Sequence, residues 1–223
     1  METVTKMRLS RETLGILKNF ANINSNILIL PGNVLKTRSA SGNIFATAKI
    51  QEEFDVSVPI WDLNKFLGVV SMFSNPDLEF SDKYVDISTG RSSVRYYYSN
   101  PSLLTVPTRD INMPNPIIQF DLDEENLEEM VKASSILQVG DLQIVAKNGQ
   151  LKITVDDSSN NTSNNFSMII NENYGGPDYK ASFNINDIKF LPGSYKVNLT
   201  NTIITKFEHN SGNIQYYIAV NKE

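Results

Sequence analysis

Two halves of this 223-residue chain follow the same order of predicted elements, and this internal repeat constrains the fold most strongly. A helix is expected over Leu9–Asn24, with Ser10 as its N-cap. Its counterpart begins at Asp123 and has a matching apolar stripe. A second helix is expected over Ile60–Met72, and its first residues are echoed by Ile185–Leu191. The repeat predicts two similar domains with two helices each.

The segments between these helices have strand patterns separated by turn residues. We expect hairpins around Pro31-Gly32-Asn33 and around Asn148-Gly149. The predicted strands of the first half are 27–30, 34–37, 43–50, 54–58, 77–81, 84–88 and 92–98. Those of the second half are 117–122, 143–146, 150–155, 166–170, 179–184, 195–199, 203–208 and 215–220.

A proline-rich stretch separates the halves. Four of the nine prolines lie in residues 99–116, which have no sustained periodicity. We therefore expect an N-terminal domain over residues 1–105, a connecting loop over 106–116 and a C-terminal domain over 117–223. The fold class is α+β, with a curved antiparallel sheet in each domain and both helices on one face.

The composition excludes several classes of protein. The chain has no cysteine, which rules out disulfides, thiolate catalysis and cysteine-based metal sites. No apolar run is long enough to span a membrane, and Met1–Lys6 lacks the pattern of a signal peptide, so a cytoplasmic protein is expected. The net charge of −5 argues against a generally basic surface but allows a local one.

Motifs for catalysis are absent from the sequence. His209 is the only histidine, which makes a His-based triad or a multi-His metal site improbable, and no phosphate-binding glycine motif occurs. The polar tract Asp156–Asn165 lacks the glycine and terminal glutamate of a calcium loop. The carboxylate run Asp121–Glu129 is expected to be solvated helix surface. No cofactor or metal is predicted, and an enzyme is disfavoured.

The first helix has an unusual polar face. Arg11, Gly15, Lys18 and Asn22 recur at spacings of four, three and four, so the stripe is basic and contains no acid. Convergent cations of this kind bind a phosphate backbone without reading its sequence. The cations on the predicted helices that could bind such a backbone, if they converge on one surface, are Arg11, Lys18, Lys65, Lys132 and Lys189. For Lys132 an ion pair with Glu128 one turn earlier is an equally good interpretation.

Four segments, in the same order along both halves, resemble the processivity clamps of T-even-type bacteriophages. They are LSRETLGILKNFANINS at 9–25, WDLNKFLG at 61–68, FNINDIKFLPGSYK at 183–196, and the ending from TKFE to YYIAV. The resemblance implies a homotrimeric ring of two-domain subunits around double-stranded DNA, with the helices lining the hole. It further implies that the five cations named above are DNA-facing residues. It also implies a non-catalytic tether for a DNA polymerase, placed by an ATP-dependent clamp loader, in the cytoplasm of an infected bacterium. Late-transcription factors are further implied partners.

A partner site is implied by the segment Tyr216-Tyr217-Ile218-Ala219, which is similar to the end of the eukaryotic clamp, proliferating cell nuclear antigen. There the second tyrosine and the alanine border a hydrophobic peptide pocket. The residues that we expect at the corresponding pocket are Ile44, Val106, Ile111, Met113, Tyr217 and Ala219.

Two alternatives stay open on sequence grounds. The chain could hold DNA on one basic face without closing a ring, or it could be a structural viral β protein. Ring closure needs a sheet edge from each end of the subunit, for which Ser92–Tyr98 and Phe166–Ile170 are the candidates.

Overall fold

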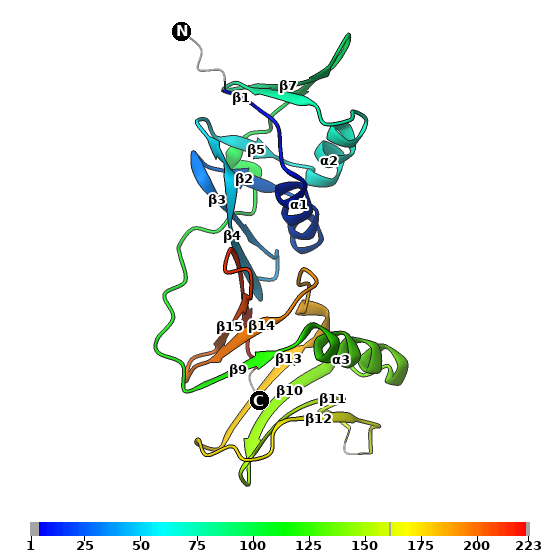
Figure 1. Cartoon of the computed structure of the whole chain (residues 1–223), viewed down its shortest axis with the longest axis vertical. Helices are drawn as coiled ribbons and strands as arrows, with labels where there is room; N and C mark the ends of the chain where they lie inside the picture. Colours follow the sequence, from blue (N-terminus) through cyan, green and yellow to red (C-terminus); the bar gives the residue numbers. More distant parts are fainter. Residues whose placement is uncertain (1–4, 161, 222–223) are drawn as a thin grey trace. The chain divides into compact units, whose positions relative to one another are not determined.

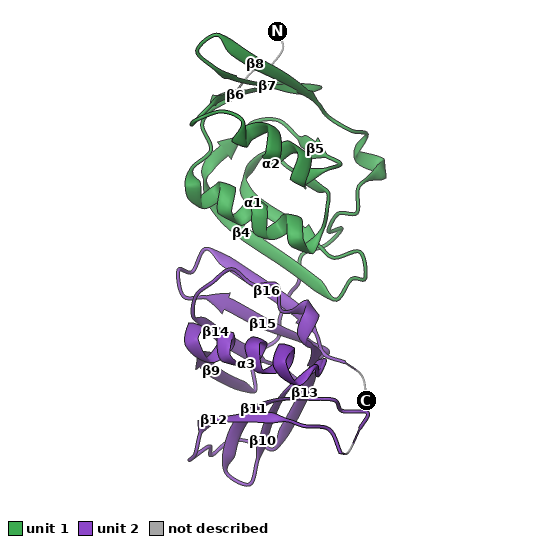
Figure 2. Ribbon diagram, turned by 90° about the vertical axis from the view of Figure 1, so that its right-hand side faces the viewer, with its two compact units in different colours: residues 1–110 green, residues 111–223 purple. Residues whose placement is uncertain are grey.

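The computed structural model describes residues 5–160 and 162–221, and the chain divides into two compact units, residues 1–110 and 111–223 (Figure 2). Residues 104–117, around this division, contain no helix or strand. Within each unit the helices lie against one side of antiparallel sheets (Figure 1). This is the α+β architecture that the repeat predicts.

Unit 1 contains the helices α1 (Arg11–Ile23) and α2 (Leu63–Ser71), which pack against each other. One four-stranded sheet has the order β1-β6-β7-β8, while β2 pairs with β5 and β3 pairs with β4. The strands are β1 (Thr5–Met7), β2 (Ile27–Ile29), β3 (Gly32–Arg38), β4 (Ile44–Phe54), β5 (Val58–Ile60), β6 (Asp77–Phe80), β7 (Tyr84–Thr89) and β8 (Ser92–Tyr97), and a short 3₁₀ turn, η1, covers Pro101–Leu103.

The first helix begins and ends as its sequence predicts. Ser10 is the N-cap, and its Oγ accepts a hydrogen bond of 3.1 Å from the Thr13 N–H. Ile16, Leu17 and Phe20 are each no more than 2% exposed, so the apolar face of α1 is part of the core. Burial of each such side chain contributes about 1.5–3 kcal/mol to folding.

Among its described residues, unit 2 contains one α-helix, α3 (Glu124–Leu137), and two four-stranded arrangements, β12-β11-β10-β13 and β16-β15-β14-β9. The strands are β9 (Ile118–Leu122), β10 (Asp141–Lys147), β11 (Gln150–Asp156), β12 (Phe166–Asn171), β13 (Tyr179–Asn184), β14 (Tyr195–Leu199), β15 (Ile204–His209) and β16 (Ile214–Ala219). Strands β10 and β11 form the predicted hairpin. Its turn residues Asn148 and Gly149 have φ values of 53° and 76°, as a type I′ turn requires.

The hairpin predicted around Pro31-Gly32-Asn33 is wrong. Strand β2 pairs instead with β5, which lies about thirty residues away in sequence, and Ile27 is opposite Ile60 in this pairing. Both side chains are buried, whereas Leu30 and Val34 beside the turn are largely exposed. The long-range pairing therefore covers more apolar surface than the local hairpin would. The strand predicted at 54–58 is also displaced, because β4 extends through Phe54 and β5 starts at Val58.

The second helix predicted in the C-terminal half is also wrong. Ile185–Asp187 form only a 3₁₀ turn, η2, and the chain then runs on without helix to β14. The Phe190 ring packs among three other rings, with centroids 4.6 Å from Tyr216, 4.8 Å from Phe207 and 5.1 Å from Tyr195. In addition, Pro192 disfavours helical geometry at the residue before it. Ring packing and proline together end the helix after one turn.

The start of α3 differs in detail from its prediction. Asp123 occupies the N-cap position, but its side chain makes no capping hydrogen bond. Instead, Ser194 Oγ accepts a bond of 3.1 Å from the Glu124 N–H. The segment before β14 is thereby tied to the N-terminus of α3.

Both strands proposed as ring-closing edges end their sheets. Strand β8 is outermost in β1-β6-β7-β8, and β12 is outermost in β12-β11-β10-β13. Within the described residues, no helix has the length and apolar character needed to cross a membrane.

Candidate nucleic-acid interface

The basic stripe of α1 lies at the surface of unit 1. Arg11 and Lys18 are both exposed, and both line a cavity of about 450 Å³ between α1 and residues 67–78. The floor of this cavity includes Leu14, Leu67 and Val70. The structure therefore brings Arg11 and Lys18 to one concave surface.

A carboxylate from β4 holds the start of α1 in place. Glu52 accepts hydrogen bonds of 2.5 Å from the Ser10 N–H and from the Thr13 hydroxyl. Partial burial raises the pKa of Glu52, but these hydrogen bonds outweigh that effect and leave the pKa below its usual value. Arg11 is consequently presented from a fixed first turn. The sequence analysis missed Glu52, because nothing in the pattern of β4 relates it to a helix about forty residues earlier.

Several cations of the sheets are paired with acids. Arg95 donates to both carboxylate oxygens of Asp86 at 2.8 Å and lies 3.8 Å from the Tyr84 ring centroid. Further ion pairs join Lys6 and Arg8 to Asp77, Lys36 to Asp110, and Lys206 to Glu208. In the part of the chain that the structure describes, Arg11, Lys18, Lys65 and Lys132 form no salt bridge. Their charges are available to an external anion.

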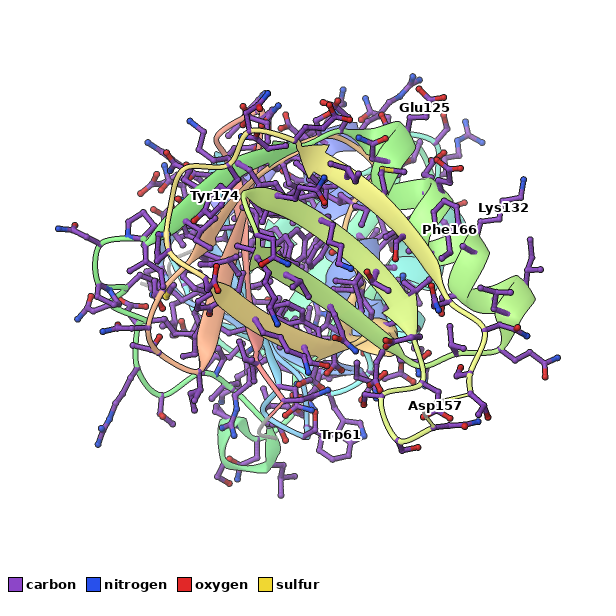
Figure 3. All side chains as sticks on the ribbon, turned by 90° about the horizontal axis from the view of Figure 1, so that it is seen from below. Trp61, Glu125, Lys132, Asp157, Phe166 and Tyr174 are labelled. Atoms are coloured by element: carbon purple, nitrogen blue, oxygen red, sulfur yellow. The ribbon has the colours of Figure 1, made fainter. Side chains whose placement is uncertain are left out.

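The other candidate cations lie at separate places. Lys65 is exposed in the first turn of α2, where its backbone N–H donates to the Asp62 N-cap at 2.8 Å. Lys132 is exposed on α3 and projects outward from that helix (Figure 3). Within the described residues, Lys132 does not form the ion pair with Glu128 that the sequence allows. Lys189 is exposed but follows η2, so it does not lie on a helix as predicted.

The residues expected at a partner pocket differ in exposure. Tyr217 is 9% exposed, and its hydroxyl donates to Gln215 Oε1 at 2.8 Å. Ala219, Val106, Ile111 and Met113 are partly exposed. Ile44 is only 1% exposed, so in this conformation it offers no surface to a ligand. Ile44 and Val106 belong to unit 1 and the other four residues to unit 2.

Two buried asparagines fix the start of the connecting loop on unit 1. Asn24 Nδ2 donates to the carbonyls of Arg38 and Thr105 at 2.8 and 2.9 Å. Asn26 Oδ1 accepts a bond of 3.0 Å from the Thr105 N–H. Sequence reasoning treated Asn24 only as the end of a helix and missed this anchor.

The polar side chains show no arrangement for metal chemistry. Across the described ranges, no group of three or more His, Asp or Glu residues could hold a metal ion. His209 ends β15, where Nδ1 accepts a bond of 3.1 Å from the Ser211 N–H and Nε2 lies 3.2 Å from the Pro192 carbonyl oxygen. This histidine links a turn to a loop, in agreement with a structural role.

Comparison with curated proteins finds phage relatives along nearly the whole chain. The chain is 33% identical to the sliding clamp of Escherichia phage RB69, with 96% of each chain covered. It is 32% identical to the sliding clamp of Enterobacteria phage T4, with 86% of each covered. Family models described as "DNA polymerase processivity factor" and "gp45 sliding clamp, C terminal" match residues 10–104 and 119–222.

The chain also has the fold of solved clamp structures. The PCNA of A. fulgidus, bound to the C-terminal region of FEN-1, matches with a TM-score of 0.72 at 12% identity, covering 100% of this chain and 99% of that one. The Helicobacter pylori beta clamp, bound to a DNA ligase peptide, matches with a TM-score of 0.74 at 11% identity, covering 100% of this chain and 67% of that one. At these identities the likeness concerns the fold alone.

Proposed function

The chain belongs to the family of phage sliding clamps, and we propose that it acts as a homotrimeric ring that encircles duplex DNA and tethers the replicative DNA polymerase for processive synthesis. The observation that supports this proposal is the pair of exposed cations Arg11 and Lys18, which form no salt bridge in the described residues and lie on a helix whose first turn Glu52 fixes, in a protein of net charge −5. Enzymatic activity is not part of the proposal, since the tether needs no bond-breaking step.

The cations act as a loose counterion layer for the phosphate backbone. Arg11 and Lys18 supply the main contacts from α1, and Lys65 adds a contact from α2. Such contacts release bound counterions, depend steeply on salt and ignore sequence. A small number of exposed side chains on flexible stems can exchange between neighbouring phosphates, so the ring moves along the duplex without a large barrier.

Ring closure is proposed to join strand β8 of one subunit to strand β12 of the next. Both strands are outermost in their sheets, so each has unpaired backbone groups that a neighbour's strand can satisfy. Because the two edges differ, the contact is head to tail and closes only through rotation into a ring.

The polymerase is proposed to bind the ring through a peptide pocket. A polymerase peptide with apolar anchors is proposed to contact Tyr217, Ala219, Ile111 and Met113 of unit 2. An ATP-dependent loader is proposed to open and place the ring, and late-transcription factors are further proposed partners. The proposed location is the cytoplasm of the infected bacterium.

A primer-extension assay with the polymerase and loader of the phage tests the DNA contact. Replacing Arg11→Ala and Lys18→Ala together is expected to shorten the extension products several-fold and to reduce the salt dependence of DNA binding by up to about two counterions. The matched control is Lys147→Ala with Lys152→Ala, two exposed or partly exposed lysines of the β10–β11 hairpin in unit 2.

Native mass spectrometry accompanies this assay. Both variants should keep a mass three times that of the 25.0 kDa chain. Unchanged product length in the Arg11 and Lys18 variant would contradict the DNA-facing assignment. A wild-type chain that stays monomeric at every concentration would contradict the ring and favour a processivity factor that does not encircle DNA.

A further inference from the structure

The connecting loop is attached to unit 1 at its start and again five residues later. At the start, the Thr105 carbonyl accepts a hydrogen bond of 2.9 Å from Asn24 Nδ2, and the Thr105 N–H donates to Asn26 Oδ1 at 3.0 Å. At the second point, Lys36 Nζ of β3 lies 2.5 Å from Asp110 Oδ1. The four residues between these points are therefore held on unit 1 at both ends.

The two attachments differ in how far water reaches them. Asn24 and Asn26 are 8% and 7% exposed, so their hydrogen bonds to Thr105 are shielded. The side chains of Lys36 and Asp110 are 36% and 70% exposed, so water and salt weaken the attraction between them. The ion pair is therefore the attachment that opens first.

The strand positions next to Lys36 supply cations rather than an acid. Arg38 projects from the same face of β3, because side chains two residues apart in a strand point the same way. Thr47 of β4 is directly opposite Lys36, and Lys49 is the next β4 residue on that face. An acid from outside these positions is needed to neutralise Lys36, and Asp110 of the loop supplies it.

The attraction depends on direct contact between the two side chains. Arg109 comes directly before Asp110, and both side chains are exposed. Their opposite charges cancel at a distance, so this end of the loop has no net charge with which to attract β3. The contact between Lys36 and Asp110 is thus specific to this pair of residues.

The ion pair also sets how much of the loop lies between attachments. In the described structure, the next backbone attachment is in unit 2, where the Ile117 N–H donates to the Leu199 carbonyl at 2.8 Å. The intervening segment is the six residues 111–116 when the pair is formed and the eleven residues 106–116 when it is open. The probability of one given placement of a flexible segment falls as about the 3/2 power of its length, so opening the pair lowers it by a factor of about 2.5.

We propose that the Lys36–Asp110 ion pair holds the first half of the connecting loop on unit 1, and that Lys36 is thereby a positioning residue for the polymerase contact. This role rests on the proposed function, in which Ile111 and Met113 of the same loop contact a polymerase peptide. Ile111 directly follows Asp110, so the pair restricts where the contacting segment begins. A loop that is placed before binding loses less conformational entropy when the partner binds.

Limited proteolysis with trypsin tests the attachment without any partner. Arg109 is an exposed trypsin site in the held segment, and cleavage there needs a locally opened chain. Lys36→Met removes one charge and leaves the residues around the cut unchanged. The fragments 1–109 and 110–223 should appear about two- to fivefold faster in this variant, because cleavage follows the population of the open form.

The same face of the sheet supplies a matched control. Lys49→Met removes the same charge at a residue that forms no salt bridge in the described structure, so its rate of cleavage after Arg109 should stay within about 1.5-fold of the wild-type rate. Lys36→Arg should restore slow cleavage. Sodium chloride at about 0.5 M should raise the wild-type rate toward that of Lys36→Met, after correction with an unstructured trypsin substrate. Equal rates in wild type, Lys36→Met and Lys49→Met would overturn the attachment.

Binding of the DNA polymerase of the same phage tests the positioning role. Biolayer interferometry should show about two- to threefold weaker binding to the Lys36→Met trimer, and wild-type affinity for Lys36→Arg and Lys49→Met. Exchanging the charges, with Lys36→Asp and Asp110→Lys together, should restore the affinity, whereas a direct contact of Lys36 with the polymerase would not be restored. Unchanged or tighter binding by Lys36→Met would overturn the positioning role. Failure of the wild-type trimer to bind the polymerase would contradict the proposed function itself, and the cleavage rates would still decide whether the ion pair holds the loop.

Discussion

Arg11 occupies a position that helix energetics disfavour. It is the first residue of α1, where the partial positive charge of the helix N-terminus repels a cation by a few tenths of a kcal/mol to about 1 kcal/mol. No salt bridge among the described residues compensates for this. Glu52 stabilises the same turn through the Ser10 N–H and the Thr13 hydroxyl and so offsets the unfavourable charge. The proposed contact with the DNA phosphates gives a reason for a cation at this position.

Replacing Glu52→Gln should destabilise the fold by about 1–2 kcal/mol at pH 7. The amide keeps the shape of the side chain but loses the charge from two hydrogen bonds, and partial exposure reduces the effect from the full range for charged hydrogen bonds. Urea denaturation of the two proteins at pH 7 measures this difference. Glu53→Gln, at the exposed neighbouring residue, is the control and should change stability by less than about 0.5 kcal/mol.

The pH dependence of the Glu52 effect has a definite sign. The pKa of Glu52 is lowered in the folded chain, so the unfolded chain binds more protons in the acid range. The contribution is therefore complete above the unfolded pKa of about 4.3 and decreases as the pH falls through the folded pKa. The stability difference between wild type and Glu52→Gln should shrink below about pH 4.3. A difference that grows on acidification would show that the carboxylate is not the stabilising form.

For individual residues, the sequence predicts contacts between near neighbours in the chain and misses contacts between residues far apart in it. Ser10 could be assigned as a cap because its partner Thr13 is three residues away. Glu52 could not be assigned, because the residues that it contacts lie about forty positions earlier and only the fold brings them together. The same reason applies to Asn26 and Thr105.

At the scale of the elements, the sequence predicted three of the four expected helices correctly. The positions of α1, α2 and α3 follow from apolar spacing and capping residues. The segment 185–191 resembles α2 in sequence, yet Phe190 contributes more by packing among aromatic rings than by continuing a helix. Similar local sequences thus have different structures because their long-range contacts differ.

Strand pairing was less predictable than strand position. The pattern of Ile27–Ile29 indicates a strand, but it does not show that this strand pairs with β5. Periodicity reports which side chains of a strand are buried, whereas pairing depends on which distant strand presents complementary apolar side chains. Pairings between strands joined by a short turn were predictable, as at Asn148-Gly149, where the turn residues determine the register, and for β3 with β4, which the structure also pairs.

The edge strands carry a prediction for assembly. Ile169 of β12 is 48% exposed in the single chain, and Ile169→Asp should abolish the trimer because it places a charge in the proposed contact with β8. Native mass spectrometry should then detect the monomer at micromolar concentration. The monomer should melt cooperatively, since the altered side chain is not part of its core.

A control for the edge variant uses another exposed aliphatic residue. Met72 caps the end of α2 and is 71% exposed, so Met72→Asp introduces the same charge away from either edge. This variant should remain trimeric. Loss of the trimer in both variants would indicate a general charge effect, and retention of the trimer in Ile169→Asp would exclude β12 as the closing strand.

At the scale of the whole molecule, charge is distributed to suit a mobile tether. The net charge of −5 disfavours adhesion of the entire surface to DNA, while the exposed cations of α1 and α2 that we propose to face DNA supply a local attraction. Tight, sequence-specific contacts would oppose movement along the duplex. Retention must therefore come from enclosure by the ring rather than from affinity, and the two can be separated by experiment.

Enclosure predicts that retention depends on the topology of the DNA. A trimer loaded on a nicked circular plasmid should stay bound during gel filtration at a salt concentration that abolishes direct binding, because the salt weakens phosphate contacts but not the ring. Cutting the plasmid once should release the protein, and blocking both ends with a bulky protein should restore retention. Ile169→Asp should not be retained on any of these DNAs. Equal retention on circular and linear DNA would mean that contact, and not enclosure, holds the protein, since a ring that encircles a free-ended duplex has nothing to stop it from sliding off.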